Sequence, residues 1–124
     1  MTMTSVAHDA SGAIDLAPAV ALFRSLGDLN RLAIVHELAR GERRIVDLTT
    51  RLGLAQSTVS AHVACLRDCG LVEGRAVGRQ SLYRLTHPEL LNMLVAAEQL
   101  LKATGNAVAL CPVYGTAGRQ ANSA

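Results

Sequence analysis

Apolar residues recur every three or four positions along the first half of the chain, a spacing typical of helices that bury one face. The expected helices cover residues 17–26, 29–39, 45–52 and 57–68. A glycine stands just after each of them, and Asp28 is a suitable N-cap for the second helix. In that helix Leu32, Val35 and Leu38 share one face, which leaves Glu37 on the outside.

The pattern then changes to a period of two, which is typical of strands. Residues 71–75 and 80–85 are expected to form a hairpin around a four-residue turn. Thr86 and Glu89 have capping-box spacing and begin a last helix that continues to about residue 102. The predicted fold is therefore mostly α with a small β-hairpin, in the order α-α-α-α-β-β-α.

The two ends of the chain lack a periodic pattern. Residues 1–16 are small and polar and are expected to be a disordered arm, and residues 104–124 form a tail rich in glycine and alanine. The region between them, residues 17–103, is expected to fold as one domain, because a chain of 124 residues suits a single core.

The composition of the chain limits which binding partners and which cellular compartment are expected. Hydrophobic residues make up 50% of the chain and the net charge is only +2, so any basic binding surface must be local. The first 15 residues do not resemble a secretory signal, and polar residues interrupt the apolar stretch near 90–101, so no membrane helix is expected. We therefore expect a cytoplasmic protein, in which cysteines are thiols or metal ligands rather than disulfides.

Two of the short predicted helices are joined through Gly53 and Leu54 and form a helix-turn-helix. The second opens with small hydrogen-bonding side chains, which suit contacts to base edges and phosphates in the major groove. The hairpin that follows carries arginines able to reach the DNA backbone or the minor groove. The candidate DNA-binding residues are Gln56, Ser57, Thr58, Ser60, His62, Arg75 and Arg79. This combination predicts a winged helix-turn-helix that binds duplex DNA.

Each of these residues has a simpler interpretation when it is taken alone. A helix start rich in serine and threonine is a common cap, and arginines usually lie on a solvated surface. The ordered combination of a helix-turn-helix and a basic hairpin favours DNA binding over these interpretations. A protein-interaction module with the same fold is the alternative from another class. No set of residues typical of an active site is visible in the sequence, so catalysis is not expected.

The three cysteines form a second candidate site. Cys65 and Cys69 are one helical turn apart, so both thiols project from one side of the recognition helix and can hold one soft cation. Cys111, in the tail, is a candidate for a third thiolate, and three thiolates suit thiophilic ions rather than Mg²⁺ or Ca²⁺. The simpler alternative is that Cys65 and Cys69 are ordinary small apolar residues and that Cys111 is a free thiol.

Several segments together carry a resemblance to a known family. Residues 26–32 read LGDLNRL, residues 56–63 read QSTVSAHV and residues 66–72 read LRDCGLV, followed by a hairpin with GRQ at 78–80 and YRL at 83–85. These segments resemble the ArsR/SmtB family of bacterial transcriptional repressors, over about residues 17–102. The resemblance implies a homodimer whose first and last helices pair across a two-fold axis. It also implies binding to an imperfect palindrome near a promoter, with release on metal or another signal.

Within that family, the pattern CLRDCG at residues 65–70 closely resembles cadmium/lead sensors. Those sensors use two cysteines so placed on the recognition helix and one from the C-terminal region of the partner subunit. The resemblance therefore implies that Cys65, Cys69 and Cys111 bind Cd(II) or Pb(II), with Zn(II) or As(III) as other candidate effectors. A repressor that responds to arsenite, or to thiol oxidation at the same cysteines, is the alternative.

Overall fold

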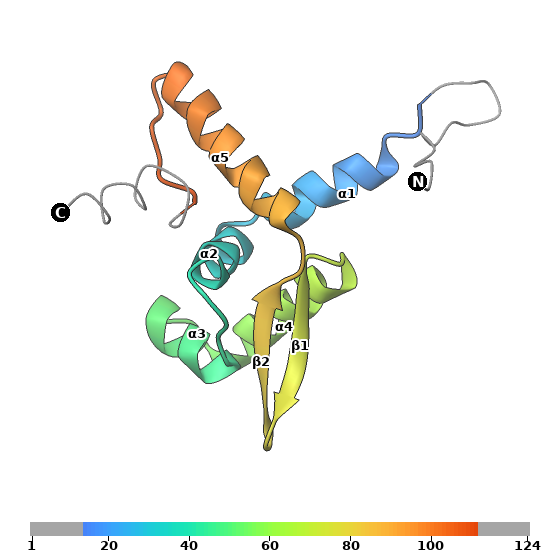
Figure 1. The fold of residues 1–124 in the computed structure, drawn as a ribbon, viewed down its shortest axis with the longest axis vertical. Helices are drawn as coiled ribbons and strands as arrows, with labels where there is room; N and C mark the ends of the chain where they lie inside the picture. Colours follow the sequence, from blue (N-terminus) through green and yellow to red (C-terminus); the bar gives the residue numbers. More distant parts are fainter. Residues whose placement is uncertain (1–13, 112–124) are drawn as a thin grey trace.

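The computed structural model describes residues 14–111 and has the predicted order of elements (Figure 1). Its helices are α1 (Ala17–Leu26), α2 (Leu29–Leu38), α3 (Ile45–Leu52), α4 (Gln56–Asp68) and α5 (Pro88–Ala103), and its strands are β1 (Val72–Val77) and β2 (Gln80–Leu85). The mostly α fold with a small hairpin is confirmed. Most of the expected arm and the tail after Cys111 lie outside the described residues. None of the described helices is long and apolar enough to span a bilayer.

The core is built from aliphatic side chains on α2, α3, α4, β1 and α5. Its fully buried side chains include an apolar stripe along α4 together with residues of α2, α3 and β1. These are Ile34, Val35, Leu48, Val59, Val63, Leu66 and Val72. Such a core fits a chain with very few aromatic residues, because branched aliphatic side chains fill the space between closely packed helices.

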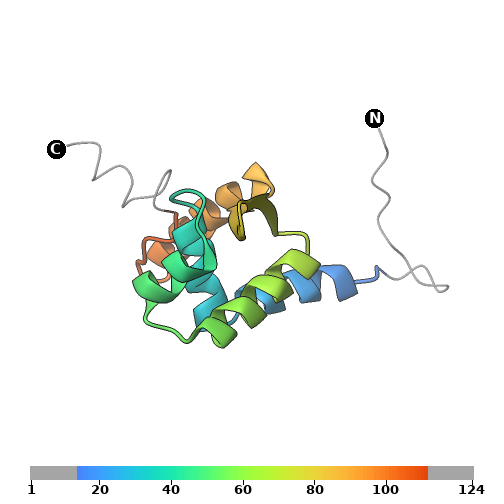
Figure 2. The same cartoon turned by 90° about the horizontal axis from the view of Figure 1, so that it is seen from below.

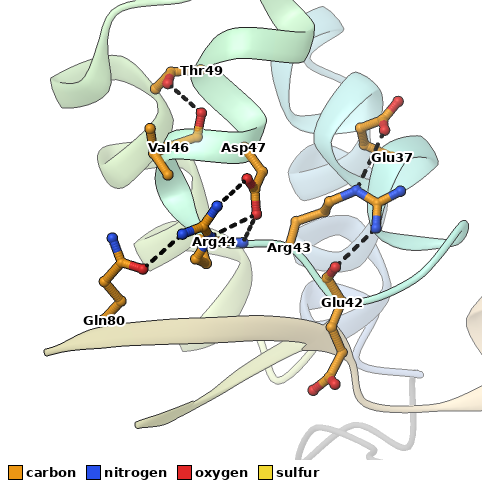
Figure 3. A network of polar contacts seen from close by, with 8 residues as sticks. All are labelled: Glu37, Glu42, Arg43, Arg44, Val46, Asp47, Thr49 and Gln80. Atoms are coloured by element: carbon orange, nitrogen blue, oxygen red, sulfur yellow. Dashed lines mark hydrogen bonds and ion pairs between the residues drawn. The ribbon is translucent and has the colours of Figure 1, made fainter. Parts of the chain in front are cut away.

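Glu37 is buried, although the apolar pattern of α2 placed it outside. Its carboxylate forms ion pairs with Arg43, in the loop before α3, and with Arg51, near the end of α3. The expectation was wrong because periodicity reports apolar contacts only, whereas a buried carboxylate is tolerated when cations surround it. These ion pairs connect α2 to both ends of α3, and Figure 3 shows the pair with Arg43.

Local signals place the boundaries of the helix-turn-helix. The Asp28 carboxylate accepts hydrogen bonds from the backbone N–H groups of Asn30 and Arg31, as expected for the N-cap of α2. Gly53 ends α3 with φ of 66°, a left-handed conformation that favours glycine. The recognition helix α4 begins at Gln56, one residue earlier than expected.

The hairpin has a tighter turn than the sequence suggested. Strand β1 extends to Val77 and pairs with Gln80, so only two residues remain in the turn instead of four. Gly78 has φ of 62° at the first of these positions, which matches the preference of two-residue hairpin turns for glycine there. Residue Arg43 pairs through its backbone with Tyr83 of β2, with N···O distances of 3.1 and 2.8 Å, and so fixes the hairpin against the α2–α3 loop.

The expected capping box at the start of α5 is wrong. His87 is the N-cap and makes no side-chain capping bond, while the Thr86 hydroxyl donates to the carbonyl oxygen of Gly70 at 2.6 Å. After α5 the chain turns back beside that helix as an irregular segment (Figure 1). The Glu98 carboxylate accepts hydrogen bonds from the backbone N–H groups of Leu110 and Cys111, which holds the end of this segment on α5.

Candidate nucleic-acid interface and cysteine site

The start of α3, the start of α4 and the hairpin border an open groove of about 300 Å³. Its polar lining consists of side chains that can donate hydrogen bonds, which are Arg44, Thr49, Gln56, Arg79, Gln80, Ser81 and Tyr83. Two of these, Gln56 and Arg79, belong to the predicted DNA-binding set. Sequence reasoning missed Arg44, Thr49 and Gln80 as groove residues. The pair of arginines just before α3 was the available signal for Arg44.

Arg44 connects α3 to the hairpin across this groove, as Figure 3 shows. Its guanidinium donates to the Asp47 carboxylate at 2.9 Å and to the Gln80 side-chain oxygen at 3.0 Å. The Arg44 side-chain hydrogen bond, followed by the bond from its backbone N–H, lowers the pKa of Asp47 to about 2. Asp47 is therefore charged at neutral pH, and its hydrogen bonds hold Arg44 in the lining of the groove.

The predicted DNA-binding residues at the start of α4 are accessible enough to contact DNA. Gln56, Ser57 and Ser60 are exposed, and Thr58 is half-buried. The first turn of α4 also presents backbone N–H groups without helical partners, a feature that favours contact with phosphate oxygens. The DNA-binding role of these residues stays a prediction.

His62, predicted to face DNA, is half-buried against the junction of α1 and α2. Its Nδ1 lies 3.5 Å from a guanidinium nitrogen of Arg31, and its Nε2 lies 3.8 Å from the Asp28 carboxylate. Backbone hydrogen bonding from Arg31 is the largest cause that lowers the pKa of Asp28, which also caps α2. His62 therefore connects the recognition helix to this junction, and a contact between His62 and DNA remains untested.

The arginines of the hairpin differ in their partners. Arg75 pairs with Glu42 at 3.1 Å, and this hydrogen bond lowers the pKa of the Glu42 carboxyl. Arg84 pairs with Glu73 across the two strands. Arg79, in the turn, makes no ion pair within residues 14–111. Of the two predicted hairpin contacts, Arg79 lies in the groove and Arg75 is engaged by a carboxylate outside it.

The cysteines are not gathered within one chain. Cys65 is half-buried on α4, Cys69 is exposed at its C-cap, and Cys111 is fully buried in the core. No group of three metal-binding side chains occurs within the part of the chain that the structure describes. The two α4 thiols are the soft donors that Cd(II) and Pb(II) prefer, so the donor chemistry fits. The third thiol joins them only if Cys111 leaves the core or a second subunit supplies it.

Comparison with known proteins places this arrangement in a family. A profile described as "Bacterial regulatory protein, arsR family" matches residues 28–74. The chain is 36% identical over 88 residues to a probable mercury resistance operon repressor of Streptomyces lividans, a match that covers 71% of this chain and 69% of that protein. This chain belongs to the ArsR family. Family membership confirms the expected resemblance and identifies the chain as a transcriptional regulator rather than an enzyme.

Two further relatives extend the likeness. The regulator CmtR of Mycobacterium tuberculosis is 39% identical over 82 residues, which cover 66% of this chain and 70% of that protein. The homodimeric winged helix-turn-helix domain of Mb0332 from Mycobacterium bovis superposes with a TM-score of 0.65 and 28% identity, over 70% of this chain and 81% of that one. The winged helix-turn-helix architecture predicted from the sequence is therefore confirmed.

Proposed function

We propose that this ArsR-family regulator is a dimeric cytoplasmic repressor that releases promoter DNA when a thiophilic metal ion binds Cys65, Cys69 and Cys111. Cd(II) and Pb(II) are the proposed effectors, with Zn(II) and As(III) as further candidates. The observation that carries the proposal is the position of two free thiols at the C-terminal end of α4, the helix whose first turn borders the groove. One helix thus holds both the reading residues and two soft ligands.

DNA binding is assigned to the groove and the exposed start of α4. Gln56, Ser57, Thr58 and Ser60 would enter the major groove, while Arg79 at the tip of the hairpin would contact the DNA backbone. Arg44 adds a second cation to the lining of the same groove. Arg75 and His62 belong to the predicted set, and their carboxylate partners make them weaker candidates.

A dimer is supported by apolar side chains exposed on the helices at the two ends of the domain. Val20 and Phe23 of α1 are 47% and 64% exposed, and Leu100 of α5 is 66% exposed. Val20 and Phe23 are three residues apart and so share one face of α1, and exposed apolar patches are typical of protein–protein interfaces. We propose that residues 17–103 are the DNA-binding and dimerisation domain, and that the tail at residues 104–124 supplies Cys111. The homodimeric state of the related Mb0332 domain agrees with this assignment.

Metal and DNA are proposed to oppose each other through α4. When bound, the metal ion would supply a link between the two α4 thiolates and a third thiolate. A cysteine drawn toward the ion would shift the C-terminal end of the recognition helix, whose first turns read DNA. A ligand that prefers the shifted state must weaken DNA binding by the same factor by which DNA weakens metal binding.

Titration of cadmium into the protein–DNA complex tests the proposal. The DNA is a duplex selected by the protein from a random library, and fluorescence anisotropy reports binding while ultraviolet absorption reports cadmium–thiolate bonds. We expect an absorption band to grow as the DNA affinity falls by about 5- to 150-fold. Cys65→Ser, Cys69→Ser and Cys111→Ser should each retain DNA binding and lose the release. Unchanged DNA affinity on addition of cadmium, or the absence of a cadmium–thiolate absorption band, would contradict the proposal.

Thiol oxidation or arsenite at the same cysteines is the second candidate function. It is favoured by the exposure of Cys69 and by the one-turn spacing between Cys65 and Cys69. Both features suit reaction of the thiols with an oxidant or with a trivalent arsenic species. The same complex exposed to arsenite, or to hydrogen peroxide without metal, separates the candidates. Release by arsenite or peroxide but not by cadmium would favour this second function.

A further inference from the structure

Ser25 is a buried polar residue in the last turn of α1, and its hydroxyl contacts one of the proposed ligands. The side chain lies beside α4, and its residue is only 5% exposed. Its Oγ donates to the carbonyl oxygen of Ala21 at 2.9 Å and lies 2.8 Å from the Sγ of Cys69. Figure 2 shows α4 passing alongside α1, and this contact joins the two helices.

The direction of the Ser25–Cys69 hydrogen bond depends on the state of the sulfur. A hydroxyl has one hydrogen, so while Ser25 donates to Ala21 the thiol of Cys69 must be the donor to Ser25 Oγ. A sulfur bound to a metal has lost that proton to solvent and can only accept. The Ser25 hydroxyl would then rotate from the Ala21 carbonyl toward the sulfur, while Ala21 keeps the helical hydrogen bond from the Ser25 N–H.

We propose that Ser25 is a positioning residue of the metal site, which donates its hydroxyl hydrogen to the metal-bound sulfur of Cys69. The inference rests on the proposed function, because it concerns the sulfur as a ligand. Hydrogen bonds from neighbouring side chains fix the direction of a ligand and stabilise its charged form. Ser25 is the α1 residue that makes this bond, so α1 contributes to a site whose ligands lie elsewhere.

The position of Ser25 is itself fixed by the junction of α1 and α2. Arg31 of α2 donates through Nε to the Ser25 carbonyl oxygen at 2.8 Å and through Nη2 to the Arg24 carbonyl oxygen at 3.2 Å. The guanidinium of Arg31 also faces His62, seven residues before Cys69 on α4. The junction therefore contacts α4 at two places, and the backbone of Ser25 is held in place by contacts that do not involve the metal ligands.

The test is the cadmium affinity of full-length Ser25→Ala, measured with Cd(II) alone against a competing chelator. We expect an affinity about 10-fold weaker than that of the wild type. The cadmium–thiolate band should persist and move to longer wavelength, because the sulfur lone pair loses a stabilising hydrogen bond. Alanine favours helix, so the variant should fold, and thermal unfolding without metal checks this.

A double-mutant cycle provides the matched control. In a Cys69→Ser background, Ser25→Ala should change the cadmium affinity by less than about 2-fold, because the sulfur through which Ser25 acts is gone. An equal loss in both backgrounds overturns the inference, and so does wild-type affinity in a folded Ser25→Ala protein. A wild type that forms no cadmium–thiolate band overturns the proposed function, and the inference with it.

Discussion

At the scale of single residues, the cations near the groove are distinguished by what already binds them. Arg44 is held by Asp47 and Gln80, and Arg75 is held by Glu42. Arg79 has no such partner among residues 14–111. A guanidinium without a carboxylate partner has no protein ion pair to break when it meets a phosphate, so Arg79 should contribute most to the salt dependence of DNA binding.

Replacement of Arg79 by alanine should weaken binding to all duplex sequences by a similar factor. The slope of log affinity against log salt should fall by about 2 in a dimer, which is about 1 for each lost cation. Arg84→Ala is the matched control, because Arg84 pairs with Glu73 and lies outside the groove. Titrations at several salt concentrations measure both slopes. Equal slopes for Arg79→Ala and the wild type would contradict the assignment.

The ion pair of Asp47 with Arg44 predicts a dependence of stability on pH. The folded pKa of Asp47 is about 2 and its ordinary value is 3.8, so its contribution is complete above about pH 4 and is lost as the pH falls through 2. Asp47→Asn should therefore melt below the wild type at pH 6, and the difference should shrink between pH 4 and pH 2. Thermal unfolding followed by circular dichroism measures it. A difference that stays constant down to pH 2 would count against the ion pair.

At the scale of elements, the hairpin depends on one close approach. The ring of Tyr83 on β2 lies over Gly74 of β1, where a Cβ atom would come within 2.8 Å of the ring. The Tyr83 backbone is paired with Arg43, so β2 cannot easily move away. The position of the hairpin beside the groove thus depends on a contact that only glycine allows without displacing the ring.

Gly74→Ala should destabilise the protein by about 1–3 kcal/mol, because the added methyl group forces the tyrosine ring aside. Chemical denaturation measures the free energy of unfolding. The same change should cost less in a Tyr83→Ala background, where the ring is absent. Costs that are equal in the two backgrounds would show that the ring is not the cause.

At the scale of the whole molecule, α1 and α5 lie at one end and the groove at the other (Figure 1). The proposed dimer interface and the proposed DNA surface are therefore separate. Hydrogen bonds connect these two regions. Ser25 of α1 contacts Cys69 at the end of α4, and Arg31 of α2 binds the backbone of Ser25. A regulator built in this way can change DNA binding without breaking its dimer.

Phe23→Glu should convert the protein to a monomer, because it places a charge on the exposed apolar face of α1. Sedimentation velocity measures the oligomeric state. Val77→Glu, an equivalent change at an exposed apolar residue of the hairpin, should leave the dimer intact. If the Phe23→Glu protein forms a dimer with the same dissociation constant as the wild type, α1 is excluded from the interface.

Local sequence determined the order of elements, the caps at Asp28 and Gly53, and the buried stripe of α4. These features depend on residues within one or two turns of each other, so their pattern can be read along the chain. Boundaries at the hairpin and at Thr86 were less accurate, because a pairing partner distant in the sequence decides where a strand or a cap ends.

Only the tertiary structure decided which groups meet across elements. It buried Glu37 between two arginines, placed Ser25 against Cys69, and put Cys111 in the core rather than beside the other thiols. None of these follows from periodicity, because each joins side chains whose packing is set by the angles between helices and by the path of the segment after α5. The sequence thus determined that α4 carries both candidate reading residues and two thiols, and the fold decided what each of them contacts.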